Sequence, residues 1–148
     1  MMRNMHSESD RRVLNERVRR LAADTAPRWG KMNAAQMVAH LTNWMGMATG
    51  ELPVRARRHP ARHFPLKQLL IYVLPMPKNL PTATELIART PESFNGEIEA
   101  FTAAMNEFAA RDRDFAWPSH PIFGAMTRRA WGALGYGHCD HHLRQFGV

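Results

Sequence analysis

The sequence predicts an all-α fold: a four-helix bundle with a long crossover between the second and third helices. Apolar residues recur at helical spacing in four separate segments of the 148-residue chain. No segment alternates apolar and polar residues in the manner of a half-buried strand. A proline-rich stretch, residues 51–89, separates the second segment from the third, and a connection of this length lets helix 3 run parallel to helix 2.

The first helix is expected from about Ser9 to Ala23. Either Ser7 or Ser9 can cap its N-terminus, because a serine hydroxyl accepts a hydrogen bond from a free backbone N–H of the first turn. Pro27 and Gly30 then break the chain. The apolar stripe of this segment consists of Val13, Leu14, Val18 and Leu21.

The second helix is expected to begin at Asn33. Asn33 and Gln36 have the spacing of a capping box, in which each side chain bonds the backbone N–H of the other. Gly50 and Pro53 mark its end. Its core face is formed by Ala34, Met37, Leu41, Trp44, Met45 and Ala48.

The connector of residues 51–89 is expected to hold one short helix, Leu66 to Leu74, and to be irregular elsewhere because proline cannot continue a helix. We expect it to belong to the same unit as the helices, so that residues 1–148 form a single helical-bundle domain. Six of the ten prolines lie in it: Pro53, Pro60, Pro65, Pro75, Pro77 and Pro81.

The third and fourth helices complete the bundle. The third is expected to start at Thr90, with Pro91 at the first helical position, where its missing N–H does no harm. A loop from Arg111 to Pro121 follows, and the fourth helix is expected from about Phe123 to Phe146. The third helix carries the clearest apolar stripe, Phe94, Ile98, Phe101, Met105 and Phe108.

Composition limits the partners and the compartment. The formal charge of +7 favours anionic partners, but the sequence has no RNA-binding signature and no recognition-helix motif, so nucleic acid is not expected to bind. The longest apolar run, Leu69 to Leu74, is too short to cross a membrane, and the N-terminus lacks the apolar core of a signal peptide. A single cysteine, Cys139, excludes an intramolecular disulfide, which favours a reducing, cytoplasmic setting.

Histidines are the residues that suggest chemistry. His138 and His142 are four residues apart on the expected fourth helix, so they lie on one face and can present two imidazoles to one metal ion. His141, three residues after His138, can also pair with it, although a helical wheel places it near the middle of the apolar face, where a core histidine is the simpler reading. His40 lies at the edge of the stripe of the second helix.

Two stretches of the chain resemble the DinB superfamily, over about residues 9–148. The first is Trp29-Gly30-Lys31-Met32, followed by Gln36-Met37 and His40. The second is His120-Pro121-Ile122-Phe123-Gly124, followed by Trp131 and the segment from His138 to Gln145.

The resemblance implies a four-helix bundle with a long second connection and a metal held by one histidine on helix 2 and two on helix 4. Carried over to this chain, the ligands are His40, His138 and His142, and Gln145 matches a glutamine that follows the histidine pair. Family members of known activity are thiol-dependent transferases or isomerases that use mycothiol or bacillithiol, and others have been considered hydrolases.

The expected function is therefore that of a divalent-metal-binding protein. Three neutral imidazoles suit zinc, nickel or iron and leave positions open for a small molecule. Two enzymatic hypotheses follow, thiol transfer from a low-molecular-weight thiol and metal-assisted hydrolysis. The alternative is a non-catalytic, structural metal-binding bundle that self-associates as a homodimer.

No catalytic base is identified in the sequence, but a basic patch suggests how a thiol could be held. If the connector folds over the metal, its cations could bind the carboxylates of such a thiol. A solvated basic loop is the plainer reading. The patch consists of Arg55, Arg57, Arg58, Arg62 and Lys67.

Overall fold

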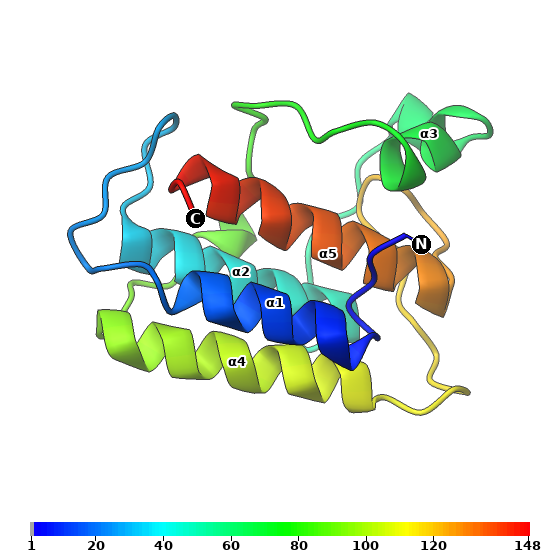
Figure 1. Ribbon diagram of the computed structural model, residues 1–148. Helices are drawn as coiled ribbons and strands as arrows, with labels where there is room; N and C mark the ends of the chain where they lie inside the picture. Colours follow the sequence, from blue (N-terminus) through cyan, green and yellow to red (C-terminus); the bar gives the residue numbers. More distant parts are fainter. Residues whose placement is uncertain (1) are drawn as a thin grey trace.

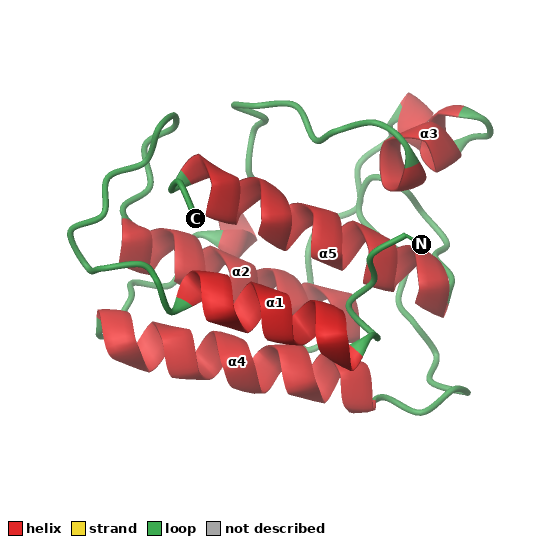
Figure 2. Cartoon of the chain, viewed as in Figure 1, coloured by secondary structure: helices red, strands yellow, loops and turns green. Residues whose placement is uncertain are grey.

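The computed structural model describes residues 2–148 and contains only helices (Figure 2). Within these residues there is no strand, only an isolated bridge between His120 and Gly124. The all-α prediction is thereby confirmed. The elements in chain order are α1 (Glu8–Val18), α2 (Ala34–Thr49), the 3₁₀ turn η1 (Pro60–Arg62), α3 (Leu66–Tyr72), the 3₁₀ turn η2 (Thr84–Leu86), α4 (Phe94–Ala110) and α5 (Arg128–Gln145).

The four longest helices pack side by side along nearly one axis (Figure 1). α2 contacts both α4 and α5, and α1 contacts the same two helices, so the four close a ring around a common core. Figure 1 shows α2 and α4 running in one direction and α1 and α5 in the other. The long connection between α2 and α4 therefore joins two parallel neighbours, as the sequence predicted.

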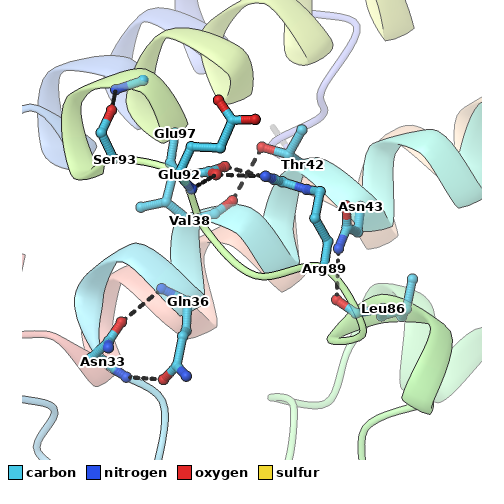
Figure 3. Close-up of polar contacts among 11 residues, drawn as sticks. Asn33, Gln36, Val38, Thr42, Asn43, Leu86, Arg89, Glu92, Ser93 and Glu97 are labelled. Atoms are coloured by element: carbon cyan, nitrogen blue, oxygen red, sulfur yellow. Dashed lines mark hydrogen bonds and ion pairs between the residues drawn. The ribbon is translucent and has the colours of Figure 1, made fainter.

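Helix starts follow the capping chemistry of the sequence at α1 and α2. The Ser7 hydroxyl accepts a hydrogen bond from Asp10 N, so α1 begins at Glu8. Asn33 and Gln36 form the expected capping box, with both side-chain to backbone distances at 2.8 Å (Figure 3). Gly50, at φ +83°, ends α2 in the left-handed region.

The predicted start of the third helix at Thr90 is wrong. α4 begins at Phe94, where the Ser93 hydroxyl accepts a hydrogen bond from Gly96 N and caps the helix. Before this cap, Arg89 donates two hydrogen bonds to Glu97, both 2.6 Å long, and this pair ties the non-helical approach to the first turn of α4 (Figure 3). Proline favours the first position of a helix, but Pro91 lies outside α4, in the non-helical segment that the pair of Arg89 and Glu97 holds.

The predicted bounds of the first and fourth helices were also too wide. α1 ends at Val18, and Leu21 is buried from the turn that follows. α5 begins at Arg128 behind the cap Thr127, not at Phe123. The residues before it are held in a turn, because His120 Nδ1 accepts hydrogen bonds from the backbone N–H groups of Ile122 and Phe123.

The connector lies along the outside of the bundle. Its short helix was predicted, and α3 packs against α5, beside the N-terminal end of that helix in Figure 1. Farther along the connector, η2 packs against α2. This second contact places Leu86 beside the face of α2 that carries His40.

The core consists of the apolar stripes of the four long helices. Its largest fully buried side chains include Trp131, Phe101, Phe108, Leu14, Met37 and Met105. In the described residues, no helix is long and apolar enough to cross a membrane.

Candidate metal centre

Three imidazoles meet where α2 faces the C-terminal half of α5. His40 comes from α2, and His138 and His142 come from successive turns of α5. Their ring centroids are 4.8 to 5.0 Å apart in all three pairs, and one nitrogen of each ring lies within 4.8 Å of the others. His40 Nε2 and His138 Nε2 are 2.9 Å apart.

Burial keeps these imidazoles neutral at pH 7. His40 is 2% exposed and His142 is 8% exposed. Desolvation lowers the pKa of His40 to about 4 and that of His142 to about 3, and it takes the pKa of His138 well below 6.5. A neutral imidazole keeps a lone pair on one ring nitrogen, which is the form that binds a metal ion.

A hydrogen-bond chain sets the proton of His142. Gln145 Nε2 donates to the carbonyl oxygen of Trp29 at 2.7 Å, so the amide turns its oxygen toward the histidine. His142 Nδ1 lies 2.8 Å from this oxygen and must donate to it. The proton of the ring is therefore on Nδ1, and Nε2 carries the free lone pair.

Gly30 makes room for this chain of hydrogen bonds between Trp29, Gln145 and His142. Its φ is +83°, and a Cβ placed on it would be only 2.4 Å from Gln145 Nε2. Any larger residue would both strain the backbone and displace the amide. Trp29 and Gly30 thus support the histidine cluster from outside. The carbonyl oxygen of Trp29 binds the amide of Gln145, and Gly30 has no side chain that would displace it.

His40 has a different environment on its second nitrogen. Nδ1 is buried and makes no hydrogen bond of normal geometry within residues 2–148. The backbone oxygen of Leu86 raises the pKa of this ring, against the larger effect of burial, and Asn43 Nδ2 holds that oxygen at 3.0 Å (Figure 3). A small rotation of the ring would let Nδ1–H donate to Leu86 and leave Nε2 free for a metal ion.

Aromatic rings hold His138 in place. Trp44 stacks on it with ring centroids 5.2 Å apart and planes 29° from parallel. Trp44 is in turn in edge contact with Trp131, whose indole N–H donates to the carbonyl oxygen of Pro118. Trp44 thus lies between His138 and Trp131, which is fully buried in the core.

The cluster fits a divalent ion with nitrogen ligands. In a tetrahedral site with bonds of about 2.0–2.1 Å, two nitrogens stand roughly 3.3 Å apart, slightly more than the 2.9 Å between His40 Nε2 and His138 Nε2. Within the described residues the cluster contains no carboxylate or cysteine, so up to three protein ligands are available. This donor set suits zinc, nickel or iron.

The neighbouring polar residues of α5 point elsewhere. Asp140 forms ion pairs with Arg17 at 2.7 Å and with Arg144 at 2.9 Å. Cys139 is fully buried in the core, and burial raises the pKa of its thiol far above the usual range. Neither residue belongs to the cluster, in agreement with the helical geometry.

The histidine cluster includes His142 and not His141. His142 belongs to the cluster, whereas His141 is half-buried and lies in edge contact with the ring of Trp29, 5.7 Å between centroids. The expectation of a core position for His141 is wrong. Much of the first half of α5 consists of glycine and alanine, which distinguish a buried face from an exposed one only weakly. The helical wheel therefore could not locate the centre of the apolar face.

The basic patch of the connector does not cover the histidines. Arg57 N and the Arg62 guanidinium donate to the carbonyl oxygen of Pro121, and Lys67 donates to that of Ala125. These contacts lie at the start of α5, whereas His138 follows Arg128 by ten residues, about 15 Å along a helix. The idea that this patch holds the carboxylates of a thiol over the metal is therefore not supported.

Other cations lie near the cluster. Lys78 stands 4.3 Å above the ring of Trp29. Lys31 lines a groove of about 300 Å³ together with His40, Gln36 and Asn43 of α2 or the turn before it. Neither lysine stands out in the sequence as a binding residue, because only the fold brings Lys31, His40 and Leu86 to one groove and Lys78 to the ring of Trp29.

Comparison with known proteins gives one result. A family profile described as the DinB superfamily matches residues 7–146, nearly the whole chain. No curated protein and no solved structure has significant similarity to the chain.

Proposed function

We propose that this chain, which belongs to the DinB superfamily, holds one divalent metal ion through His40, His138 and His142 and acts with it on a small molecule. The observation that carries the proposal is the meeting of three neutral, largely buried imidazoles with no carboxylate or thiolate among them. His142 Nδ1 donates to Gln145, so its Nε2 lone pair is free for an ion, and His40 Nδ1 is buried without a hydrogen-bond partner among the described residues.

The chemistry that a divalent ion supplies at an open site is Lewis acidity, which lowers the pKa of a bound water or thiol. The residues of the chain prepare the site for it. Gln145 fixes the proton of His142 on Nδ1, Trp44 orients the ring of His138, and burial keeps all three rings neutral. This arrangement supports thiol transfer or hydrolysis, and zinc, nickel or iron as the metal.

The compartment and the alternative function are proposals of the same kind. A single free, buried cysteine suits a reducing, cytoplasmic setting. A non-catalytic, self-associating bundle is favoured by one observation: Phe64 is 81% exposed and Val73 is 69% exposed, at the two ends of α3. Sedimentation velocity distinguishes a homodimer from a monomer, and turnover distinguishes an enzyme from a structural protein.

The test of the metal site is metal content measured by plasma mass spectrometry on protein purified without a histidine tag. We expect about one equivalent of zinc, nickel or iron in the natural protein and little in His138→Ala. His141→Ala is the matched control, since it removes a histidine from the same helix outside the cluster, and it should retain the metal. Circular dichroism shows that each variant is folded. No metal in the natural protein, even after incubation with these ions, refutes the proposal.

A further inference from the structure

A groove of about 300 Å³ opens beside His40. Its buried side is formed by Ala39, His40 and Leu86, and its exposed rim carries Lys31, Gln36 and Arg89. The groove lies between α2 and the segment that follows η2 (Figure 3). Its volume is at the small end of the range for ligand sites, and one of its walls is a histidine of the candidate metal centre.

The charge of the groove is positive. No acidic side chain lines it, and two cations do. Both terminal nitrogens of Arg89 donate hydrogen bonds to Glu97, so the charge of Arg89 is largely neutralised. Lys31 is in no ion pair with any residue of the described chain, and its ammonium group is left to attract an anion.

Two amide side chains in the groove have polar atoms to spare. Gln36 uses its oxygen in the capping box at Asn33, which leaves its NH₂ group free to donate. Asn43 uses its NH₂ group on the carbonyl oxygen of Leu86, which leaves its own oxygen free to accept. The rim thus offers two donors, Lys31 and Gln36, and the side toward Leu86 offers an acceptor.

We infer that the groove binds the carboxylate end of a small anionic substrate, with Lys31 as the residue that recognises its charge. A carboxylate accepts from the ammonium of Lys31 and the amide of Gln36, while the uncharged part of the molecule lies along Ala39 and Leu86 toward His40. The inference rests on the proposed function, because it assigns the substrate class of the same centre.

The experiment uses cobalt-substituted full-length protein and two thiol probes of nearly the same shape. 3-Mercaptopropionate carries a carboxylate and 3-mercaptopropionamide does not, and binding of either sulfur to cobalt is read from the charge-transfer band in the near-ultraviolet. We expect the natural protein to bind the carboxylate probe more tightly, by up to about fivefold at low salt, as is typical of one exposed ion pair. The preference should shrink as salt is added.

Two lysine variants locate the effect. Lys31→Met should bring the ratio of the two dissociation constants to about one, whereas Lys78→Met, which removes the same charge from above Trp29, should leave it unchanged. Equal affinity for both probes in the natural protein overturns the inference, and so does a cobalt-loaded protein in which the carboxylate probe gives no sulfur band. An equal loss in both variants also overturns it, because it would indicate a general electrostatic attraction instead of recognition by Lys31. Protein that takes up no cobalt shows no visible spectrum at all, which refutes the proposed function and the inference with it.

Discussion

Replacing Gly30 with alanine tests whether the turn before α2 supports the histidine cluster. The new Cβ would be 2.4 Å from Gln145 Nε2, and the backbone φ of +83° disfavours any side chain. The backbone strain costs about 1 kcal/mol. Displacing Gln145, which is 4% exposed, removes its hydrogen bonds to Trp29 and His142, at about 1 kcal/mol each.

The expected total is therefore about 3 kcal/mol of the free energy of unfolding, measured by urea denaturation of the metal-free protein. Metal affinity should fall by about 10- to 100-fold, because the proton of His142 is no longer fixed on Nδ1. Competition with a chromophoric chelator measures this second effect.

Two other glycines separate the contributions. Gly50 has the same φ of +83°, but its Cβ would meet nothing closer than 3.9 Å, so Gly50→Ala should cost only the strain and leave metal affinity unchanged. Gly137 is helical and its Cβ would meet nothing within 4 Å, so Gly137→Ala should stabilise by about 0.5–1 kcal/mol. The reasoning fails if Gly30→Ala resembles Gly50→Ala in both assays, or if its extra cost persists when Gln145 is already alanine.

Three further predictions concern buried groups. Burial lowers the pKa of His40 to about 4 and that of His142 to about 3, so below pH 6.5 these histidines bind protons in the unfolded chain but not in the folded one. The free energy of unfolding of the metal-free protein should therefore fall by ~1.4 kcal/mol per pH unit for each histidine as the pH falls toward those values. A denaturation profile that is flat from about pH 7.5 to 5 would contradict this. The thiol of Cys139 should react with Ellman's reagent only after unfolding, because it is fully buried and burial raises its pKa; prompt reaction in buffer would refute this. Arg89→Ala should destabilise the fold by about 2–3 kcal/mol in thermal or urea unfolding, because it leaves the carboxylate of Glu97, 3% exposed, buried without its partner. Glu97→Ala should destabilise it by less, because the Arg89 that it leaves unpaired can reach water. The reverse order would show that the buried carboxylate is not the costly partner.

Local chemistry made some boundaries predictable. The capping box at Asn33 and the glycine at position 50 bound α2 correctly, because a cap is satisfied by residues within one turn. The starts of α4 and α5 were missed although they too depend on local caps. Both helices begin behind a local cap, Ser93 and Thr127, which the prediction passed over in favour of Pro91 and Phe123. The ion pair of Arg89 with Glu97 and the turn held by His120 stabilise non-helical conformations just before these caps.

The sequence by itself determined the helical class and the pairing of His138 with His142, because both depend only on the repeat of the α-helix. It left open whether His141 or His142 faces His40, and whether the basic patch of the connector lies over the histidines or is a solvated loop. Only the packing of α5 against α2 brings the three rings within 5.0 Å of one another, and only the path of the connector brings Leu86 to His40 while it sends Arg57 and Arg62 to the far end of α5. Distances across the bundle depend on how side chains fill the space between helices, and no spacing along the chain encodes them.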